Sequence, residues 1–257
     1  MSTILEAKGI CKYFGGLKAV DGLSFKVEKG SIAGLIGPNG AGKSTAFNCL
    51  TGTYPLTSGN ITFNGQDVTG KNAHQLANLG LVRTYQNNKI FPELTVYENI
   101  LMGADRRNTT TDFKDIFGLG SAKEDRKKAH EKVMEILEFT KLTPYKDLVS
   151  KNLAHGIQRY LAIATALACE PILLLMDEPA TGLNPEETSD LMDLIKRIRN
   201  EKDTTVLLIE HDMKLVMNVC EFITVINFGQ KLAEGVPKEI SSNPLVIEAY
   251  LGRGSEF

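Results

Sequence analysis

Short apolar runs recur along the chain at a length typical of buried strands. Residues 32–36, 172–176 and 206–209 are almost continuously apolar, and 222–226 is a further run of this kind. Apolar runs without alternation are typical of strands covered on both faces, as in a parallel sheet. A helical pattern over 186–200 lies between two of the runs. Strands that alternate with helices in this way predict an α/β fold with a parallel sheet.

Other parts of the chain carry different patterns. Residues 25–28 alternate between apolar and polar, and 59–65 is predicted to be a short strand between turns. From Thr109 to Lys128 the chain is polar, so we expect a loop that leads into a helix over 124–139, whose charged start is a solvated face. The sequence therefore predicts an α/β core interrupted by a mainly helical insertion, roughly 88–165.

A phosphate-binding motif follows the first buried run. The pattern GxxxxGK[ST] is matched without departure by Gly37, Pro38, Asn39, Gly40, Ala41, Gly42, Lys43 and Ser44, and Thr45 begins a helical stretch. Glycines let backbone N–H groups curl around an anion, and the helix N-terminus adds a positive dipole end. In this motif the lysine reaches the β- and γ-phosphates and the serine hydroxyl is placed to ligate Mg²⁺. The context of strand, loop and helix is the one the motif requires.

Two acidic residues end the second apolar run. Asp177 and Glu178 follow residues 172–176 directly. Because ligands bind at the carboxyl ends of parallel strands, we expect Asp177 to lie near the phosphate loop and to hold Mg²⁺. Side chains alternate along a strand, so Glu178 is expected on the other side, free to orient or deprotonate a water that attacks the γ-phosphate.

Composition narrows the functional classes. The chain has 257 residues, a length of one to two domains, with 29 Lys and Arg against 31 Asp and Glu and a net charge of −2. Nucleic-acid binders usually carry a basic excess, so we expect no nucleic-acid partner. The sequence has no run of about 18 apolar residues that would span a membrane, and its first residues lack a basic stretch followed by an apolar one, so we expect no secretory signal. Four widely spaced cysteines indicate reduced thiols in the cytoplasm.

The segment Leu153–Arg159, which directly precedes a helical stretch predicted over 160–168, resembles the signature motif of ABC-type ATPases. Together with the phosphate loop, Gln86, the acidic pair and His211, it is similar in order and spacing to a complete ABC nucleotide-binding domain over 1–252. The resemblance implies a P-loop NTPase core with a parallel sheet and an antiparallel β subdomain over 1–87 and 166–252. It also implies a helical subdomain over 88–165. Residues 253–257 are interpreted as a cloning scar.

Four longer runs resemble the branched-chain amino acid importer subfamily of these ATPases. They are Phe14–Gly22, Arg83–Asn87, Leu94–Asn99 and Glu178–Glu186. The resemblance implies an ATP-hydrolysing subunit that powers import of branched-chain or related amino acids. The alternatives are the ATPase of a lipopolysaccharide exporter, whose cassette is similarly compact, and a non-transport ABC ATPase. The transported molecule is chosen by other subunits.

The resemblance also implies roles for individual residues, with ATP and Mg²⁺ as cofactors. Phe14 matches the aromatic that stacks on adenine, with Tyr13 as an alternative. Gln86 matches the glutamine that senses Mg²⁺ and the attacking water and couples to the membrane subunit. His211 matches the histidine that contacts the γ-phosphate. Ser44, Gln86 and Asp177 are then the metal residues, and Glu178, His211 and Gln86 the catalytic ones.

The signature departs from its usual Leu-Ser-Gly-Gly form. Ala154, His155 and Gly156 follow Leu153, so the serine hydroxyl that bonds the γ-phosphate is absent. Backbone N–H groups near Gly156 and the following helix N-terminus still bind an anion, so we expect a working but weaker contact. Thr165 stands where the signature helix often has arginine, and the sequence offers no account of its effect.

The family resemblance implies an assembly. Two such domains pack head to tail with two ATP molecules between them, so that the signature of one faces the phosphate loop of the other. The second domain is a copy of the chain or a paralogous ATPase. The partners are two membrane permease subunits and, indirectly, a periplasmic or extracellular substrate-binding protein. The chain is then expected on the cytoplasmic face of the membrane as a peripheral protein.

Overall fold

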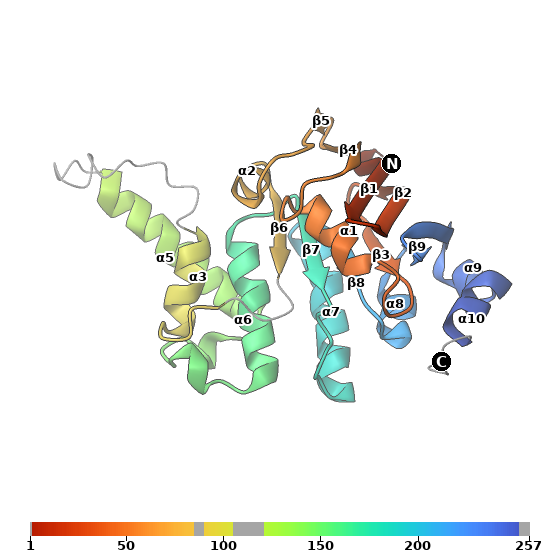
Figure 1. Ribbon diagram of the computed structural model, residues 1–257. Coiled ribbons are helices and arrows are strands. Elements are labelled where there is room, and N and C mark those ends of the chain that lie inside the picture. Colours follow the sequence, from red (N-terminus) through yellow and green to blue (C-terminus); the bar gives the residue numbers. More distant parts are fainter. Residues whose placement is uncertain (1, 85–89, 105–120, 252–257) are drawn as a thin grey trace. The chain divides into compact units, whose positions relative to one another are not determined.

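The computed structural model describes residues 2–84, 90–104 and 121–251 (Figure 1). The described residues form two compact units. The first combines Met1–Arg83 with Ile172–Phe257, and the second is Thr84–Pro171. The first unit therefore brings together the two halves of the chain that carry the predicted buried strands.

A six-stranded sheet lies in the first unit, and its central strand precedes the phosphate loop. Its strands are β3 (Ile32–Ile36), β6 (Leu81–Thr84), β7 (Leu173–Asp177), β8 (Thr205–Ile209), β9 (Phe222–Asn227) and β10 (Gln230–Gly235), in the order β10-β9-β3-β8-β7-β6. β3 pairs in parallel with both β8 and β9, and β7 pairs in parallel with β8. Every residue of β3, β7 and β8 is buried, which confirms the interpretation of the continuous apolar runs.

An antiparallel sheet packs over the same core. Its strands are β1 (Thr3–Phe14), β2 (Leu17–Glu28), β4 (Ser58–Phe63) and β5 (Gln66–Asp67), in the order β2-β1-β4-β5. The buried cluster joins residues of this sheet, such as Phe25, to Leu35 and Leu175 of the other sheet and to Phe47. The expected P-loop core with a parallel sheet and an antiparallel β subdomain is confirmed.

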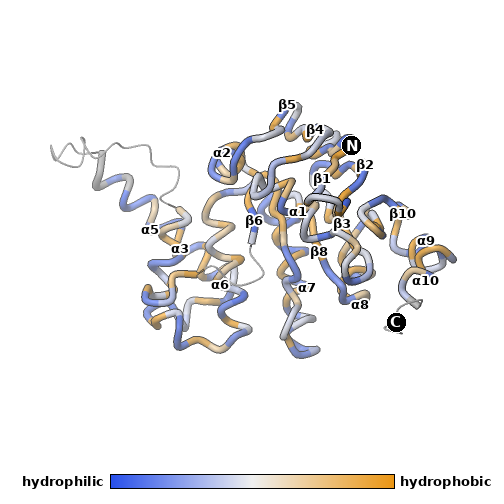
Figure 2. Tube along the Cα trace, viewed as in Figure 1, coloured by the Kyte–Doolittle hydropathy of each residue, from blue (hydrophilic) through white to orange (hydrophobic). Residues whose placement is uncertain are grey.

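Helices complete the first unit. They are α1 (Lys43–Leu50), α2 (Ala73–Asn78), α7 (Pro185–Glu201), α8 (Met213–Val219), α9 (Pro237–Ser241) and α10 (Pro244–Leu251). The helix predicted over 186–200 is α7, which buries Leu191, Ile195 and Ile198. In Figure 2 hydrophilic (blue) and hydrophobic (orange) positions alternate along it. The side chain of Asn184 begins α7 by accepting the backbone N–H groups of Glu186 and Glu187. Asn184 is thus an N-cap, which Asn favours.

The second unit is mainly helical. Its elements are α3 (Val96–Ala104), α5 (Ser121–Phe139), α6 (His155–Ala168) and two short 3₁₀ turns, η2 (Thr143–Tyr145) and η3 (Ser150–Asn152). Their buried faces form one cluster that includes Ile100, Leu137 and Leu161. The helix predicted over 124–139 is α5, which begins at Ser121. The part of the expected polar loop at 109–120 lies outside the described residues.

Two expectations from composition concern the whole chain. Within the described ranges, no helix combines the length and the apolar character needed to cross a membrane. All four cysteines are described, and each is a buried thiol that forms no disulfide. This agrees with the interpretation of reduced cysteines.

Candidate active site

The phosphate loop joins β3 to α1, and close backbone contacts fix two of its glycines. A Cβ at Gly37 would lie 2.1 Å from the carbonyl oxygen of Ile226, and one at Gly42 would lie 2.3 Å from that of Ala19. Gly42 also has a φ of 101°, in the left-handed region that favours glycine. The backbone N–H of Gly229 donates to the carbonyl oxygen of Ala41 at 2.8 Å. The loop conformation therefore depends on β2 and on the β9–β10 turn.

The loop presents its anion-binding groups to solvent. Asn39, Gly40 and Ser44 are exposed, and Thr45 is half-buried. Gly42 is the N-cap of α1 and has no side chain to satisfy the first N–H groups of the helix. These groups and the positive end of the helix dipole attract an anion such as a phosphate.

Lys43 folds back over this loop. Its Nζ donates to the carbonyl oxygens of Gly37 at 2.7 Å and Pro38 at 3.1 Å, and the residue is only 6% exposed. Burial lowers the pKa of Lys43, and the carboxylates of Glu178, Asp177 and Glu210 oppose that shift. The ammonium group is thus a buried cation at the loop that lacks a carboxylate in direct contact among the described ion pairs.

Asp177 ends β7, and the two oxygens of its carboxylate have different surroundings. Oδ2 forms an ion pair with the guanidinium of Arg83. Oδ1 is buried and has no hydrogen-bond partner within the described part of the chain. A buried carboxylate oxygen without a partner is costly unless a ligand completes it. Carboxylate and hydroxyl oxygens suit Mg²⁺, so the donor set of Asp177 and Ser44 fits that ion.

Glu178 is placed by a turn and not by strand alternation. β7 ends at Asp177, and Glu178 has a φ of 47°, the left-handed conformation that is rare outside glycine. The argument from side-chain alternation along a strand is therefore wrong for Glu178, because the residue follows the strand in a left-handed turn. Its backbone N–H donates to the carbonyl oxygen of Ile209 at 2.9 Å. Backbone conformations of this kind cost about 1–3 kcal/mol and cluster at functional sites.

His211 lies opposite Glu178, after the end of β8. Its Nδ1 is 3.9 Å from Oε1 of Glu178 and equally far from Oε2 of Glu210, and the ring is 48% exposed. Glu178 itself is 18% exposed. An accessible imidazole and carboxylate thus face each other at the carboxyl ends of two neighbouring parallel strands, where ligands bind.

Glu210 is a site residue that the sequence reasoning did not single out. Its side chain is fully buried and accepts the backbone N–H groups of Ala180 at 2.7 Å, His211 at 3.1 Å and Asp212 at 3.4 Å. Burial raises the pKa of Glu210, and these three backbone donors lower it. The carboxylate ties the turn after Glu178 to the turn that carries His211. Its position directly after a buried strand was the available signal.

Arg83 is a second residue whose role was missed, because the sequence showed it only within a longer run. One guanidinium nitrogen pairs with Asp177, and the other donates to Oδ1 of Asn48 at 2.7 Å and to Oγ1 of Thr51 at 3.2 Å. Its Cζ lies 5.6 Å from the centre of the Phe47 ring. Arg83 therefore connects the ends of β6 and β7 to the helix that follows the phosphate loop.

The two aromatic candidates at the end of β1 differ in accessibility. Phe14 is 44% exposed, stands edge-to-face to Tyr54 with centroids 5.5 Å apart, and lies 5.0 Å from Nζ of Lys12. The hydroxyl of Tyr13 donates to Asp21 at 2.5 Å, and this bond raises the pKa of Tyr13. Phe14 is thus the more exposed of the two rings.

The signature residues begin a helix of the second unit. Ala154 is the N-cap of α6, so His155 and Gly156 lie in its first turn, whereas the sequence favoured a helix from Tyr160. Alanine has no side-chain oxygen to cap the first N–H groups, and Ala154 and His155 are exposed. The amide of Gln158 donates to the carbonyl oxygen of Leu153 at 3.2 Å and steadies the approach to the helix.

Two further expectations have limited support. Gln86 lies outside the described residues. Thr165 donates its hydroxyl to the carbonyl oxygen of Leu161 at 2.9 Å within α6, which satisfies its polar group locally. This contact explains how the helix accommodates threonine. It does not explain what effect the absence of the arginine has.

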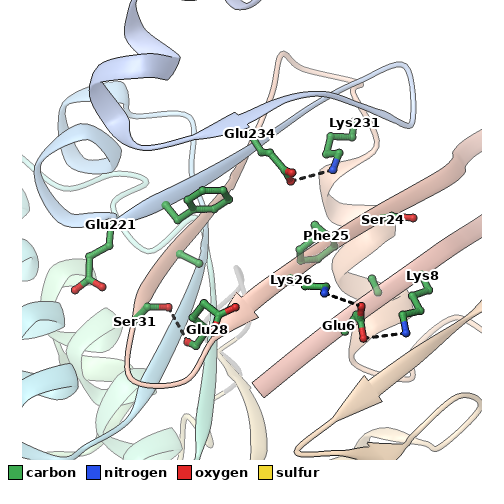
Figure 3. Close-up of a pocket in the computed structure, with 13 residues that line it drawn as sticks. Glu6, Lys8, Ser24, Phe25, Lys26, Glu28, Ser31, Glu221, Lys231 and Glu234 are labelled. Atoms are coloured by element: carbon green, nitrogen blue, oxygen red, sulfur yellow. Dashed lines mark hydrogen bonds and ion pairs between the residues drawn. The ribbon is translucent and has the colours of Figure 1, made fainter. Parts of the chain in front are cut away.

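A cavity of about 470 Å³ elsewhere in the first unit lies between β1 and β2 on one side and β9 and β10 on the other (Figure 3). Five of its charged lining residues form ion pairs with one another. Glu6 pairs with Lys8 and Lys26 at 3.1 and 3.3 Å, and Lys231 pairs with Glu234 at 2.9 Å. No residue of the phosphate loop lines it, so it is separate from the candidate active site.

Comparisons with known proteins agree with the geometry. Residues 20–181 match the family described as ABC transporter, and 230–256 match the branched-chain amino acid ATP-binding cassette transporter family. The chain is 46% identical over 249 residues to the high-affinity branched-chain amino acid transport ATP-binding protein BraF of Pseudomonas aeruginosa, covering 97% of this chain and 98% of BraF. It is 43% identical to LivG of Escherichia coli, with the same coverage. A solved cassette of an ABC transporter, in its ADP conformation, superposes with a TM-score of 0.84 at 34% identity, covering 98% of this chain and 100% of that one.

Proposed function

The chain belongs to the ABC transporter family of ATP-binding subunits and is an ATPase, and from this premise we propose that it powers import of branched-chain or related amino acids. The match of 230–256 to the branched-chain amino acid cassette family supports the substrate class. So does the near full-length similarity to BraF and LivG, whose names give that role. The arrangement of phosphate loop, Asp177, Glu178 and His211 in one unit is the observation that carries the ATPase chemistry.

The first step is binding of ATP. The exposed backbone from Asn39 to Ser44 receives the phosphates, and Lys43 exchanges its carbonyl contacts for phosphate oxygens. Phe14 stacks on the adenine. The exposed ring of Phe14 and the bonded hydroxyl of Tyr13 favour Phe14 for this role.

Mg²⁺ is the proposed metal cofactor. Ser44 and Asp177 would hold it, with Gln86 as the third metal residue from the family resemblance. The unpartnered Oδ1 of Asp177 supports this assignment. When bound, the ion supplies charge stabilisation to the phosphates.

Hydrolysis needs a base and a group that stabilises charge. Glu178 accepts a proton from the attacking water as the water oxygen bonds to the γ-phosphorus, the bond between the γ-phosphorus and the β-phosphate oxygen breaks, and ADP and inorganic phosphate leave. His211 contacts the γ-phosphate, and Glu210 fixes the two turns that carry Glu178 and His211. The left-handed conformation of Glu178 supports a functional role, because the surrounding structure holds it at a cost.

The site of one chain is proposed to be completed by a second ATPase. Ala154, His155 and Gly156 offer the uncapped start of α6 to the γ-phosphate bound by that partner. The division into a core over 1–87 and 166–252 and a helical subdomain over 88–165 belongs to this proposal. The other partners are two membrane permeases and, through them, a substrate-binding protein, with the chain on the cytoplasmic face.

Uptake of radiolabelled leucine by native cells tests the proposal. Cells that lack the chain should lose high-affinity uptake, the parent chain should restore it, and Glu178→Gln should not. Glu201→Gln, an exposed carboxylate on α7, is the matched control and should restore uptake. Uptake that is unaffected by loss of the chain would refute the substrate class. Loss of lipopolysaccharide export instead would move the function to the exporter and leave the ATPase chemistry unchanged.

A further inference from the structure

We infer that Arg83 is the positioning residue of the metal site, setting which oxygen of Asp177 is offered to Mg²⁺ and where that oxygen lies relative to α1. The inference rests on the proposed function, because it takes Asp177 as the metal ligand. Its observations are the contacts that Arg83 makes and the oxygen of Asp177 that it leaves open.

The guanidinium of Arg83 contacts only one of the two carboxylate oxygens of Asp177. Arg83 pairs with Oδ2, and Oδ1 is buried with no hydrogen-bond partner in the described chain. A carboxylate held through one oxygen cannot rotate freely, since a charge-assisted bond to arginine is strong and directional. Oδ1 is therefore the oxygen that faces a ligand. Ligating carboxylates are usually held by such a neighbouring hydrogen bond.

The other end of Arg83 reaches the helix that carries Ser44. Its second nitrogen donates to Asn48 and Thr51, and its Cζ lies over the ring of Phe47. The hydroxyl of Thr51 donates to the carbonyl oxygen of Phe47 at 2.8 Å, so Thr51 is itself fixed to the end of α1. One planar group thus spans β7, with Asp177, and α1, with Ser44. Lysine, with a single ammonium group, does not reproduce that fork.

Stability alone does not account for this arrangement. The side chains of Arg83 and Asp177 are 8% and 3% exposed, and buried ion pairs of this kind are often no better for stability than packed apolar residues. A pair selected for stability would also satisfy Oδ1. A carboxylate with one oxygen clamped and the other left open is instead the arrangement expected of a metal ligand.

The test measures the dependence of ATP binding on Mg²⁺ in the full chain carrying Glu178→Gln, which prevents turnover. ATP affinity is measured by calorimetry over a series of free Mg²⁺ concentrations and in EDTA. Mg²⁺ is expected to strengthen ATP binding, and Arg83→Met should raise the Mg²⁺ concentration that gives half of this gain in ATP affinity by about 10- to 100-fold. This is the range seen when a hydrogen-bond partner of a metal ligand is removed. ATP affinity in EDTA should change little, since the described hydrogen bonds of Arg83 go to Asp177, Asn48 and Thr51, which lie outside the phosphate loop.

Two variants separate positioning from other effects. Arg83→Lys keeps the charge and should give a shift intermediate between parent and Arg83→Met. Arg197→Met removes a half-buried arginine that pairs with Glu201 on α7 and should leave the Mg²⁺ dependence unchanged. Thermal unfolding of each variant without nucleotide checks the fold. If Arg83→Met does not fold, the same Mg²⁺ series is measured on Arg83→Lys and on Asn48→Ala, which removes one of the anchors of Arg83, and each should also need more Mg²⁺ than the parent.

The outcomes distinguish this inference from the proposed function. Asp177→Asn in the same assay should abolish the Mg²⁺ effect, and if it does not, Asp177 is no metal ligand and the proposed site is wrong. If Asp177→Asn abolishes the effect while folded Arg83 variants match the parent, only the role of Arg83 is refuted. A lower Mg²⁺ requirement in Arg83→Met would also refute it, because the guanidinium would then be a competitor of the ion.

Discussion

Nδ1 of His211 lies 3.9 Å from Oε1 of Glu178, across the ends of two neighbouring parallel strands. The distance is longer than a hydrogen bond. The imidazole is 48% exposed and the carboxylate 18% exposed, and the phosphate loop begins at the same carboxyl edge of the sheet, after β3. Beneath them, the buried carboxylate of Glu210 joins the two turns through backbone N–H groups.

Glu178→Gln tests the proposed base directly. The substitution keeps the shape of the side chain but removes the proton acceptor, so we expect ATP hydrolysis to fall by about 100-fold or more while ATP binding persists. Steady-state phosphate release and calorimetric ATP affinity measure the two effects. Glu201→Gln on the outer face of α7 should match the parent. Equal hydrolysis by Glu178→Gln and the parent would remove Glu178 from its role.

Lys43→Ala tests the phosphate loop. Removing a cation that bonds phosphate oxygens costs about 1.5–3 kcal/mol, which is roughly a 10- to 100-fold loss of ATP affinity. Lys196→Ala, an exposed lysine on α7, is the control and should bind ATP normally. An unchanged affinity in Lys43→Ala, with the fold intact by circular dichroism, would contradict the assignment of this loop to the nucleotide.

Gly42→Ala tests the close packing of the same loop. A Cβ would meet the carbonyl oxygen of Ala19 at 2.3 Å in a left-handed conformation, so we expect a loss of at least about 1 kcal/mol in the free energy of unfolding. Urea unfolding of the nucleotide-free protein measures it. Gly16→Ala is the matched control, because a Cβ there meets nothing within 4 Å. If the two variants were equally stable, the contact with Ala19 would not constrain the loop.

The four cysteines should differ in reactivity. A hydrogen bond from the side chain of Ser58 lowers the pKa of Cys11, whereas burial raises the pKa of Cys49 to about 11 and that of Cys220 to about 12. Thiolates are the reactive form, so near pH 8 the folded protein should be alkylated at Cys11 before Cys49 and Cys220. Mass spectrometry after brief iodoacetamide treatment identifies the site, and unfolding in urea should expose all four thiols. Earlier alkylation of Cys220 than of Cys11 would contradict this order.

The parts of the fold that followed from sequence are those decided by local pattern. β3, β7 and β8 are buried on both faces, so their apolar runs need no knowledge of their neighbours. The start of α6 was missed because Ala154 offers none of the side-chain oxygens that mark a helix N-terminus.

The site was predictable only in part, for a related reason. The phosphate motif lies within one short segment, whereas the pairing of Arg83 with Asp177 joins positions from the two halves of the chain. No spacing rule indicates such a pair. The left-handed turn at Glu178 arises from contacts with the end of β8, so it is equally hidden from a strand pattern. The catalytic and metal roles themselves stay predictions until the variants are measured.

The dependence of the phosphate loop on distant backbone has a consequence for biosynthesis. Gly37 packs against Ile226, and the carbonyl oxygen of Ala41 accepts a hydrogen bond from the backbone N–H of Gly229. Strand β3 has β8 and β9 as its two neighbours. During translation the ribosome releases the loop and Ala19 early but β8, β9 and Gly229 late, so the nascent chain carries the loop long before all of its supports are present. Competence to bind ATP should therefore arise only when synthesis is nearly complete, which keeps unfinished chains from acting as ATPases.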